Sequence, residues 1–303
     1  GYDRNYDYLP DKKYLMDKTG YKIAIASGKG GTGKTFVSTN LFNVLKEKSM
    51  PVTLIDCDAE EPNDREFFLG ENTNSFDVMQ EVPVIDTANC TYCGKCAEYC
   101  QYNAIFFLQE ARMIQVMEDL CHGCGSCFVA CEFGAITAKK SVLGSVNTYL
   151  IDNNATLTEA RMKVGVHSPV PVIKAAIKQA KPTDLVLMDA PPGTSCPFIQ
   201  TVNLADYVVL VTEPTPFGLS DLKQSVETLK TMGKSYGVII NRAGLGDEGV
   251  YNYLEKEKIT LLMSIPFDRK IASVYSNGKL LTNELPEWKA KFRELLSLIT
   301  AQL

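Results

Sequence analysis

The stretch Gly28-Lys29-Gly30-Gly31-Thr32-Gly33-Lys34-Thr35 matches the pattern G-x4-G-K-[ST]. It follows an apolar run at residues 23–26 and precedes a helix-like stretch at residues 36–48, so it stands where a strand leads into a helix. Glycines let consecutive backbone N–H groups converge on phosphate oxygens, and a helix N-terminus adds positive partial charge. We expect Lys34 to reach the outer phosphates of a nucleotide and Thr35 to bind its magnesium ion. The other residues expected to touch the phosphates are Gly28, Gly30, Gly31, Thr32 and Gly33.

Eight of the ten cysteines form two copies of one spacing, C-x2-C-x2-C-x3-C, which start at residues 90 and 121. Three thiolates within seven residues can wrap one corner of an iron–sulfur cube, and the fourth cysteine of each run reaches across to the other cube. The spacing therefore predicts two [4Fe–4S] clusters. The first set of ligands is Cys90, Cys93, Cys96 and Cys131, and the second set is Cys121, Cys124, Cys127 and Cys100.

The two runs, CTYCGKCAEYCQYNAI and CHGCGSCFVACEFGAI, resemble a bacterial two-cluster ferredoxin. They depart from that family at Gln101 and Glu132, where proline usually follows the fourth cysteine. Two other uses of the cysteines are open. Structural zinc takes four ligands, so a third cysteine at the same spacing in both runs would be surplus, and a disulfide framework suits a small secreted protein with a leader segment, a pattern not seen here. We expect His122, inside the second run, to be exposed beside a cluster rather than to coordinate it.

A second lysine in the glycine-rich loop, Lys29, makes the form KGGTGKT, which resembles the deviant Walker A motif of the MinD/ParA family of ATPases. The resemblance implies ATP and ADP as ligands, magnesium-dependent ATP hydrolysis and an ATP-controlled homodimer. In that dimer Lys29 would reach the phosphates bound by the partner. A solvated surface lysine is the alternative.

Two stretches resemble the switches of that family. An apolar strand at residues 52–55 ends in Asp56-Cys57-Asp58, and another at residues 185–188 ends in Asp189. Residues two apart on a strand share a face, so Asp56 and Asp58 could both look toward magnesium. The resemblance implies that Asp58 positions the attacking water, that Asp56 is an outer-sphere partner of magnesium, and that Asp189 holds magnesium through water. Cys57 should face the interior of the sheet.

Two later segments extend the resemblance. Strands at residues 207–212 and 238–240 lead to Glu213 and to Asn241-Arg242. By resemblance, Asn241 reads the edge of adenine with its amide donor and acceptor, Arg242 lies beside the nucleotide, and Pro266 walls the base. A turn-forming Asn241 is the alternative.

Length and composition agree with a divided chain. With 303 residues and 45% hydrophobic content, the chain can bury one sizeable core and a small satellite. Strands alternating with helices, such as those expected at residues 170–180 and 219–232, predict an α/β fold with a mostly parallel, doubly wound P-loop NTPase sheet. The domains expected are an N-terminal extension at residues 1–20, flexible or left from expression, a discontinuous MinD-like ATPase at 21–83 and 141–303, and an inserted small α+β bacterial-ferredoxin-like domain at 84–140.

The charge pattern limits the partners. The net charge of −5 and the absence of a basic stripe among aromatic residues argue against nucleic-acid binding. Apolar residues at helical spacing in residues 288–303 predict a helix that packs on the ATPase, the alternative being a membrane-surface helix, and no apolar run is long enough for stable membrane insertion. Cys196 is either a ligand of a cluster shared between subunits or a buried or redox-active thiol. We expect a cytoplasmic protein.

Three functions fit these features. The first, placed slightly ahead by family resemblance, is ATP-driven maturation or delivery of an iron–sulfur or other metal cofactor to a client apoprotein. The second is ATP-gated electron transfer from the clusters to a redox partner, which four thiolates around each cube favour. The third is a positioning or scaffold ATPase whose clusters sense redox state.

Overall fold

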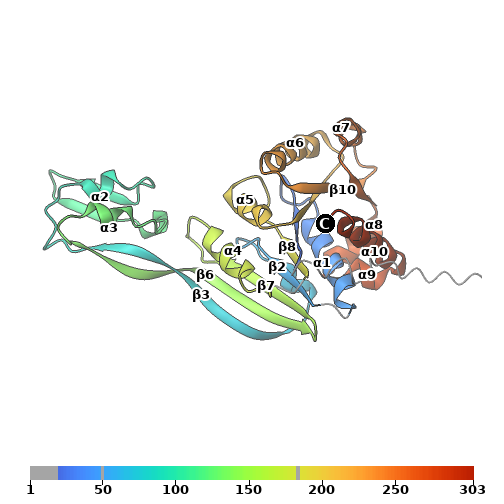
Figure 1. The fold of residues 1–303 in the computed structure, drawn as a ribbon, viewed down its shortest axis with the longest axis horizontal. Helices are drawn as coiled ribbons and strands as arrows, with labels where there is room; N and C mark the ends of the chain where they lie inside the picture. Colours follow the sequence, from blue (N-terminus) through green and yellow to red (C-terminus); the bar gives the residue numbers. More distant parts are fainter. Residues whose placement is uncertain (1–19, 49–50, 182–184) are drawn as a thin grey trace, which may run out of the picture.

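The computed structural model describes residues 20–48, 51–181 and 185–303, so the expected N-terminal extension lies outside the described residues except for Gly20. Within this part of the chain, one sheet of nine strands forms the main body (Figure 1). Across the sheet the strands follow in the order β11 (Leu261–Pro266), β10 (Ser235–Ala243), β9 (Tyr207–Thr212), β1 (Lys22–Ala26), β8 (Leu185–Asp189), β2 (Val52–Asp56), β7 (Ala155–Met162), β6 (Ile136–Asp152) and β3 (Glu71–Ile85).

The pairings from β11 to β7 are parallel, whereas β6 pairs antiparallel with both β7 and β3. Every residue of β2, β8 and β9 is buried. Such continuous burial is typical of parallel strands that are covered on both faces. The predicted α/β fold with a large, mostly parallel sheet is therefore confirmed.

Helices cover both faces of the sheet, because alternate side chains of each strand point to opposite sides. Ile23 and Ile25 of β1 belong to one hydrophobic cluster, and Ala24 and Ala26 to the other. The first cluster includes side chains of α1 (Lys34–Lys46), α8 (Arg269–Ser276), α9 (Leu281–Glu284) and α10 (Pro286–Thr300), and the second includes side chains of α4 (Val170–Ile177), α5 (Cys196–Asn203), α6 (Pro216–Thr231) and α7 (Gly249–Glu257).

Strands β3 and β6 are much longer than the others and leave the main sheet as a two-stranded ribbon (Figure 1). The pairing of β6 with β7 starts at Gly144, so residues 136–142 of β6 pair with β3 alone. A register shift between Val78 and Met79 leaves Leu143 as the extra residue of a bulge, at the point where the support of β7 ends. Both expected domain boundaries fall inside these continuous strands.

The ribbon carries a small unit at its tip, which we call the cysteine module and define as residues 86–135 (Figure 1). It contains α2 (Lys95–Glu98), the antiparallel pair β4 (Ile105–Leu108) and β5 (Met113–Val116), a short 3-10 helix η2 (Glu118–Leu120) and α3 (Ser126–Ala130). Its core is minimal: Cys96, Ile105 and Cys127 are its buried cluster. A unit with so little apolar core gains little stability from burial alone.

The last helix, α10, packs on the main body as the apolar spacing predicted. Trp288, Phe292, Leu295 and Ile299 are buried in the first hydrophobic cluster. The ring of Phe292 lies 6.2 Å from that of Phe36 on α1, centroid to centroid. None of the helices in the described part of the chain combines the length and apolar character that a membrane crossing needs.

We predict that Phe292→Ala lowers the free energy of unfolding of the main body by about 3–5 kcal/mol, because it leaves a cavity between α10 and α1. Urea unfolding followed by tryptophan fluorescence measures the change, since Trp288 is the chain's one tryptophan and lies on the same helix. The matched control is Leu298→Ala, which removes a side chain that is 41% exposed on α10. Equal effects of the two substitutions would contradict this packing.

Candidate functional site

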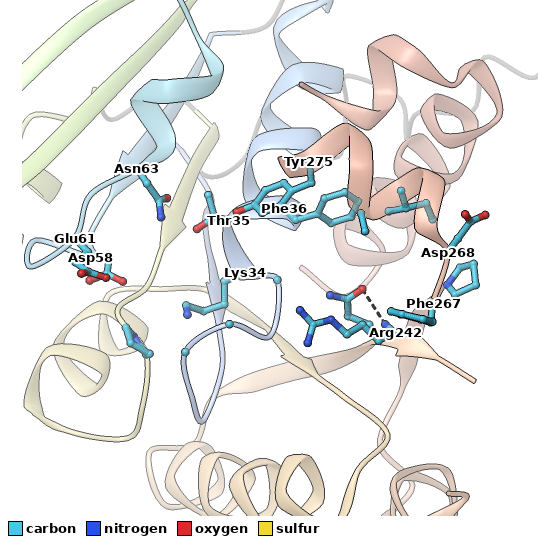
Figure 2. Close-up of a pocket in the computed structure, with 18 residues that line it drawn as sticks. Lys34, Thr35, Phe36, Asp58, Glu61, Asn63, Arg242, Phe267, Asp268 and Tyr275 are labelled. Atoms are coloured by element: carbon cyan, nitrogen blue, oxygen red, sulfur yellow. Dashed lines mark hydrogen bonds between the residues drawn. The ribbon is translucent and has the colours of Figure 1, made fainter. Parts of the chain in front are cut away.

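The glycine-rich loop forms the floor of a cavity of about 460 Å³ at the carboxyl end of the parallel strands. Gly33 adopts a left-handed conformation with φ of 100°, and a side chain there would also meet the amide of Asn241 at 2.4 Å. Helix α1 begins at Lys34, two residues earlier than predicted, so its N-terminus faces the cavity. Figure 2 shows Lys34 between Asp58 and Glu61 on one side and Arg242 and Phe267 on the other.

Thr35 and Asp189 provide the strongest indication of a magnesium site. The Thr35 hydroxyl donates to Oδ2 of Asp189 at 2.7 Å. The other carboxylate oxygen, Oδ1, is buried and has no hydrogen-bond partner. Burial raises the pKa of Asp189 to about 6, although Lys34 and the Thr35 hydroxyl act in the opposite direction. A hydroxyl beside a buried, unsatisfied carboxylate fits a hydrated magnesium ion, which takes oxygen ligands and keeps several waters.

The two aspartates after β2 lie in different surroundings. Asp58 is half-buried and lines the cavity, and burial raises its pKa while Lys34 opposes that rise. Asp56 is buried and accepts three backbone N–H groups, from Asp58 at 3.1 Å, Asn63 at 2.8 Å and Asp64 at 3.0 Å. We call residues 57–64 the carboxylate loop. Asp56 thus faces this loop, and its role as a magnesium partner stays a prediction.

Asp64, at the end of the carboxylate loop, is a feature that the sequence analysis missed. It is fully buried, and both its carboxylate oxygens lack a hydrogen-bond partner. Burial and the neighbouring Asp56 hold the pKa of Asp64 well above its usual range, and burial and Asp189 do the same for Asp56. The sequence gives no period or motif at residue 64 that marks it.

Asn241 and Arg242 line the cavity, but their polar groups already have partners in the chain. The amide of Asn241 donates to the carbonyl of Thr32 at 2.7 Å, and its oxygen accepts the backbone N–H of Arg242 at 2.9 Å. Arg242 pairs with Glu213 at 2.5 Å, and Lys29 pairs with the same carboxylate at 3.3 Å. Asn241 therefore holds the glycine-rich loop in this structure, and adenine recognition by Asn241 stays a prediction.

The far wall of the cavity is formed by α8 and the loop before it. Pro266 lines it together with Phe267, Asp268, Ile271, Ala272 and Tyr275, and Phe36 of α1 also lines the cavity. Contact of Pro266 with a base stays a prediction. The rings of Phe36 and Tyr275 meet edge to face with centroids 5.7 Å apart. An apolar wall next to a phosphate loop suits a flat nucleobase. Helix α8 was not foreseen as part of the site, because its residues carry no recognisable motif.

The structure brings the two predicted sets of cysteines together. The first set, Cys90, Cys93, Cys96 and Cys131, lines one small cavity of the cysteine module, and the second set, Cys100, Cys121, Cys124 and Cys127, lines another. The fourth cysteine of each run does lie with the three leading cysteines of the other run. No three His, Cys, Asp or Glu side chains among the described residues converge on a point suited to a single metal ion.

The sequence repeat is also a repeat of backbone conformation. Three positions with positive φ recur at the offset of the two runs: Tyr92 (55°) and Gly123 (62°), Gly94 (78°) and Gly125 (79°), and Asn103 (52°) and Gly134 (63°). Backbone N–H groups of Tyr92 and Gly123 point at the sulfurs of Cys90 and Cys121 at 3.4 Å. Such N–H···S contacts stabilise thiolates that hold an iron–sulfur cluster.

Burial raises the pKa of the thiols of Cys96, Cys121 and Cys127. A buried thiolate needs a cation, so binding of iron would release protons from these groups. The arrangement of four thiols around each cavity, with N–H donors at the sulfurs, fits a four-iron cube. That these residues hold clusters stays a prediction at this point.

The two remaining cysteines lie in the main body. Cys57 is fully buried, as predicted, and donates its backbone N–H to the carbonyl of Asp189 at 2.9 Å. Cys196 is exposed at the first residue of α5. It is therefore not a buried thiol, and its other two expected roles stay open. His122 is exposed, as expected, but it also contacts His167, which the sequence analysis did not single out.

A parallel sheet with a glycine-rich loop between β1 and α1, and carboxylates at the ends of β2 and β8, defines the class of P-loop nucleotide-binding proteins. The model of the family described as CobQ/CobB/MinD/ParA nucleotide binding domain matches residues 23–281. The chain belongs to this family. The match runs across the cysteine module and ends before α10.

Two relatives align with most of this chain. The Methanocaldococcus jannaschii protein MJ0579 is 30% identical over 85% of this chain and 90% of its own length. A Pyrococcus horikoshii protein named iron-sulfur cluster carrier protein is 24% identical over 93% of this chain and 86% of its own length. The chain thus resembles, at low identity, a protein named for iron–sulfur clusters.

Two solved structures share the fold. The cell division ATPase MinD of Pyrococcus furiosus has a TM-score of 0.56 at 21% identity, with 92% of this chain and 98% of that chain covered. The septum site-determining protein MinD of Pyrococcus horikoshii, solved with Mg-ADP, has a TM-score of 0.54 at 23% identity, with 94% of this chain and 100% of that chain covered. At these identities the likeness concerns the fold.

We predict that Lys34→Ala lowers the rate of ATP hydrolysis about 100-fold or more, because the substitution removes the buried cation that we expect at the outer phosphates. Phosphate release measures the rate, and Lys256→Ala, an exposed lysine of α7 outside the cavity, serves as control. Hydrolysis that survives in Lys34→Ala would remove the phosphate assignment.

A second prediction separates the two roles of Asn241. If its amide mainly holds the loop at Thr32, Asn241→Ala weakens ATP and GTP binding by the same factor, roughly two- to tenfold for one hydrogen bond. We expect this result from calorimetric titration with both nucleotides. Selective loss of ATP affinity, with GTP binding unchanged, would instead assign Asn241 to the base.

Proposed function

We propose that the protein is a magnesium-dependent ATPase that gates electron transfer from two resident [4Fe–4S] clusters to a redox partner. The observation that carries the proposal is the pair of four-cysteine cavities, each lined by one complete predicted set of ligands. A cube held by four thiolates is closed to exchange, which suits a resident electron carrier. We therefore rank electron transfer ahead of delivery of a cofactor to a client protein. Family resemblance alone placed delivery slightly ahead.

The residues around the phosphates support hydrolysis of ATP to ADP and phosphate. Backbone N–H groups of the glycine-rich loop and the N-terminus of α1 bind the phosphates, and Lys34 neutralises charge on the outer ones. Thr35 and Asp189 hold magnesium, which supplies charge neutralisation between the phosphates when bound. Asp58, half-buried at the cavity wall, orients the attacking water.

The thiolates of Cys90, Cys93, Cys96 and Cys131 hold one cluster, and those of Cys100, Cys121, Cys124 and Cys127 hold the other. When bound, these clusters supply one-electron oxidation and reduction. The chain itself positions the two sets side by side in one module and directs backbone N–H groups at the sulfurs of Cys90, Cys100 and Cys121. Cys93 and Cys124 are exposed, which gives an electron a short way to the surface on each set.

The chain connects the two sites directly. Asp58, Glu61 and Asn63 of the carboxylate loop line the nucleotide cavity, the 3-10 helix η1 (Asp64–Phe67) follows, and β3 then leads to the cysteine module. Loops that contact the outer phosphate rearrange when that phosphate is lost. A rearrangement of the carboxylate loop would therefore reach the base of the ribbon.

Self-association is part of the proposal. Lys29 is held by Glu213 in one chain, and on the family resemblance it would turn to the phosphates of a partner copy when ATP is bound.

Delivery of a cluster to a client apoprotein is the second candidate, favoured by the relative named iron-sulfur cluster carrier protein. Within the described residues, the cysteines outside the module are Cys57, which is buried, and Cys196, which is exposed. Outside the module, one chain therefore offers no pair of exposed cysteines that could hold a transferable cluster.

One experiment separates these functions. Anaerobic protein is loaded with radiolabelled iron, which we expect at about eight atoms per chain with an equal amount of sulfide. It is then reduced, freed of reductant, and mixed with an oxidised viologen dye and apo-ferredoxin in the presence of MgATP or MgADP. We expect faster reoxidation with MgATP while the labelled iron stays on the protein.

The control is Lys34→Ala, which should keep its iron and lose the difference between MgATP and MgADP. Movement of labelled iron to apo-ferredoxin under MgATP, with reoxidation indifferent to the nucleotide, would establish delivery in place of electron transfer. Protein that binds zinc and no sulfide would exclude both.

A further inference from the structure

Three aromatic rings meet between the cysteine module and the main body. The ring of His122 stacks on Tyr102, with centroids 3.8 Å apart and planes 10° apart. The ring of His167 meets His122 edge to face at 5.9 Å. The chain has two histidines, and both are in this contact. Tyr102 and His122 belong to the module, whereas His167 belongs to the loop of residues 163–169 between β7 and α4, which we call the strap loop.

The contact lies beside the second set of cysteines. His122 directly follows Cys121, and Tyr102 is two residues after Cys100. A cavity of about 150 Å³ lies here between Cys121 and His122 of the module, Leu143 of the ribbon bulge, and Val166 and His167 of the strap loop. Cys121 is also tied to the ribbon, because the amide of Gln80 donates to its carbonyl at 2.9 Å. The loop around Cys121 is thus held from two sides.

Two backbone hydrogen bonds tie the start of the strap loop to the carboxylate loop and to the ribbon bulge. The backbone N–H of Met162, the last residue of β7 just before the strap loop, donates to the carbonyl of Ala59 in the carboxylate loop at 2.8 Å. The next residue, Lys163, donates its N–H to Leu143 at 2.8 Å, and Leu143 is the extra residue of the ribbon bulge. Ala59 follows Asp58, which lines the nucleotide cavity. Three contacts therefore join the cavity wall, the ribbon base and the loop around Cys121.

The contact between the rings of His122 and His167 buries little apolar surface, so we expect it to add little to the stability of the fold. His122, His167 and Val164 of the strap loop are exposed, Val164 at 96%, whereas Val166 of the same loop packs against the second hydrophobic cluster. Contacts with little buried apolar surface open at low free-energy cost. A deeply buried contact at the same place would fix the module permanently.

We propose that His167 and His122 are positioning residues through which the strap loop transmits the state of the carboxylate loop to Cys121 of the second cluster. The inference rests on the proposed function and adds a route to it, separate from the chain path along β3. Movement at Asp58 shifts Ala59 and Met162, the strap loop follows, and the His167 ring moves the His122 ring and its neighbour Cys121.

Hydrogen exchange with mass spectrometry tests the route on full-length, cluster-loaded protein under anaerobic conditions, with MgADP and with a non-hydrolysable ATP analogue. In the wild type, we expect exchange in residues 57–64, 163–169 and 118–126 to differ between the nucleotides. In His167→Ala, the difference should persist in residues 57–64 and 163–169 and fall at least twofold in residues 118–126.

Two further variants make the test specific. His167→Phe keeps an aromatic edge and should retain the response of residues 118–126, which assigns the effect to ring packing. Val164→Ala changes an exposed side chain of the same loop and should behave as wild type.

An unchanged response of residues 118–126 in His167→Ala, or a wild type that responds at 57–64 but not at 118–126, would overturn the inference while leaving the proposed function standing. Wild-type protein without iron and sulfide, found by analysis before any exchange measurement, would overturn both.

Discussion

The carboxylate of Asp56 is the group on which the arrangement of the functional parts depends. It is buried at the end of β2, in register with Asp189 on β8 and Glu159 on β7, and it accepts three backbone N–H groups of the carboxylate loop. Burial without these donors would be costly for a carboxylate, and the loop without the carboxylate would lose its internal anchor. The bonds fix where Asp58 meets the cavity and where the chain turns toward the ribbon.

The glycine-rich loop, the strand ends and the cysteine repeat could be predicted from the sequence, because each is local and strongly constrained. Gly33 needs a left-handed backbone, the aspartates follow short and mostly apolar runs, and two copies of a four-cysteine spacing fit few kinds of metal centre. The strand at residues 207–212 was predicted at its observed bounds. The grouping of Cys131 with Cys90, and of Cys100 with Cys121, also followed from spacing alone.

Other features depend on contacts between distant residues, which no local pattern reveals. The ribbon strands carry many polar residues and were assigned partly to each domain, since most residues of β3 are exposed and its first fully buried residue is Val82. No local pattern identifies the hydrogen-bond partner of the Asn241 amide, because that partner, the carbonyl of Thr32, is 209 residues away in the sequence. Asp64 and His167 belong to no motif, and their importance comes only from the side chains placed around them.

The ribbon bulge has a geometric consequence. Beyond the bulge at Leu143, residues 136–142 of β6 are paired with β3 alone, and at about 3.3 Å per residue this portion is roughly 23 Å long. A tilt of about 10° at the point where β7 ends would therefore carry the far end of this portion through roughly 4 Å. Rearrangements too slight to disturb the sheet would thus be larger at the far end, so the distance from the module to any docked protein could vary while the main body keeps its shape.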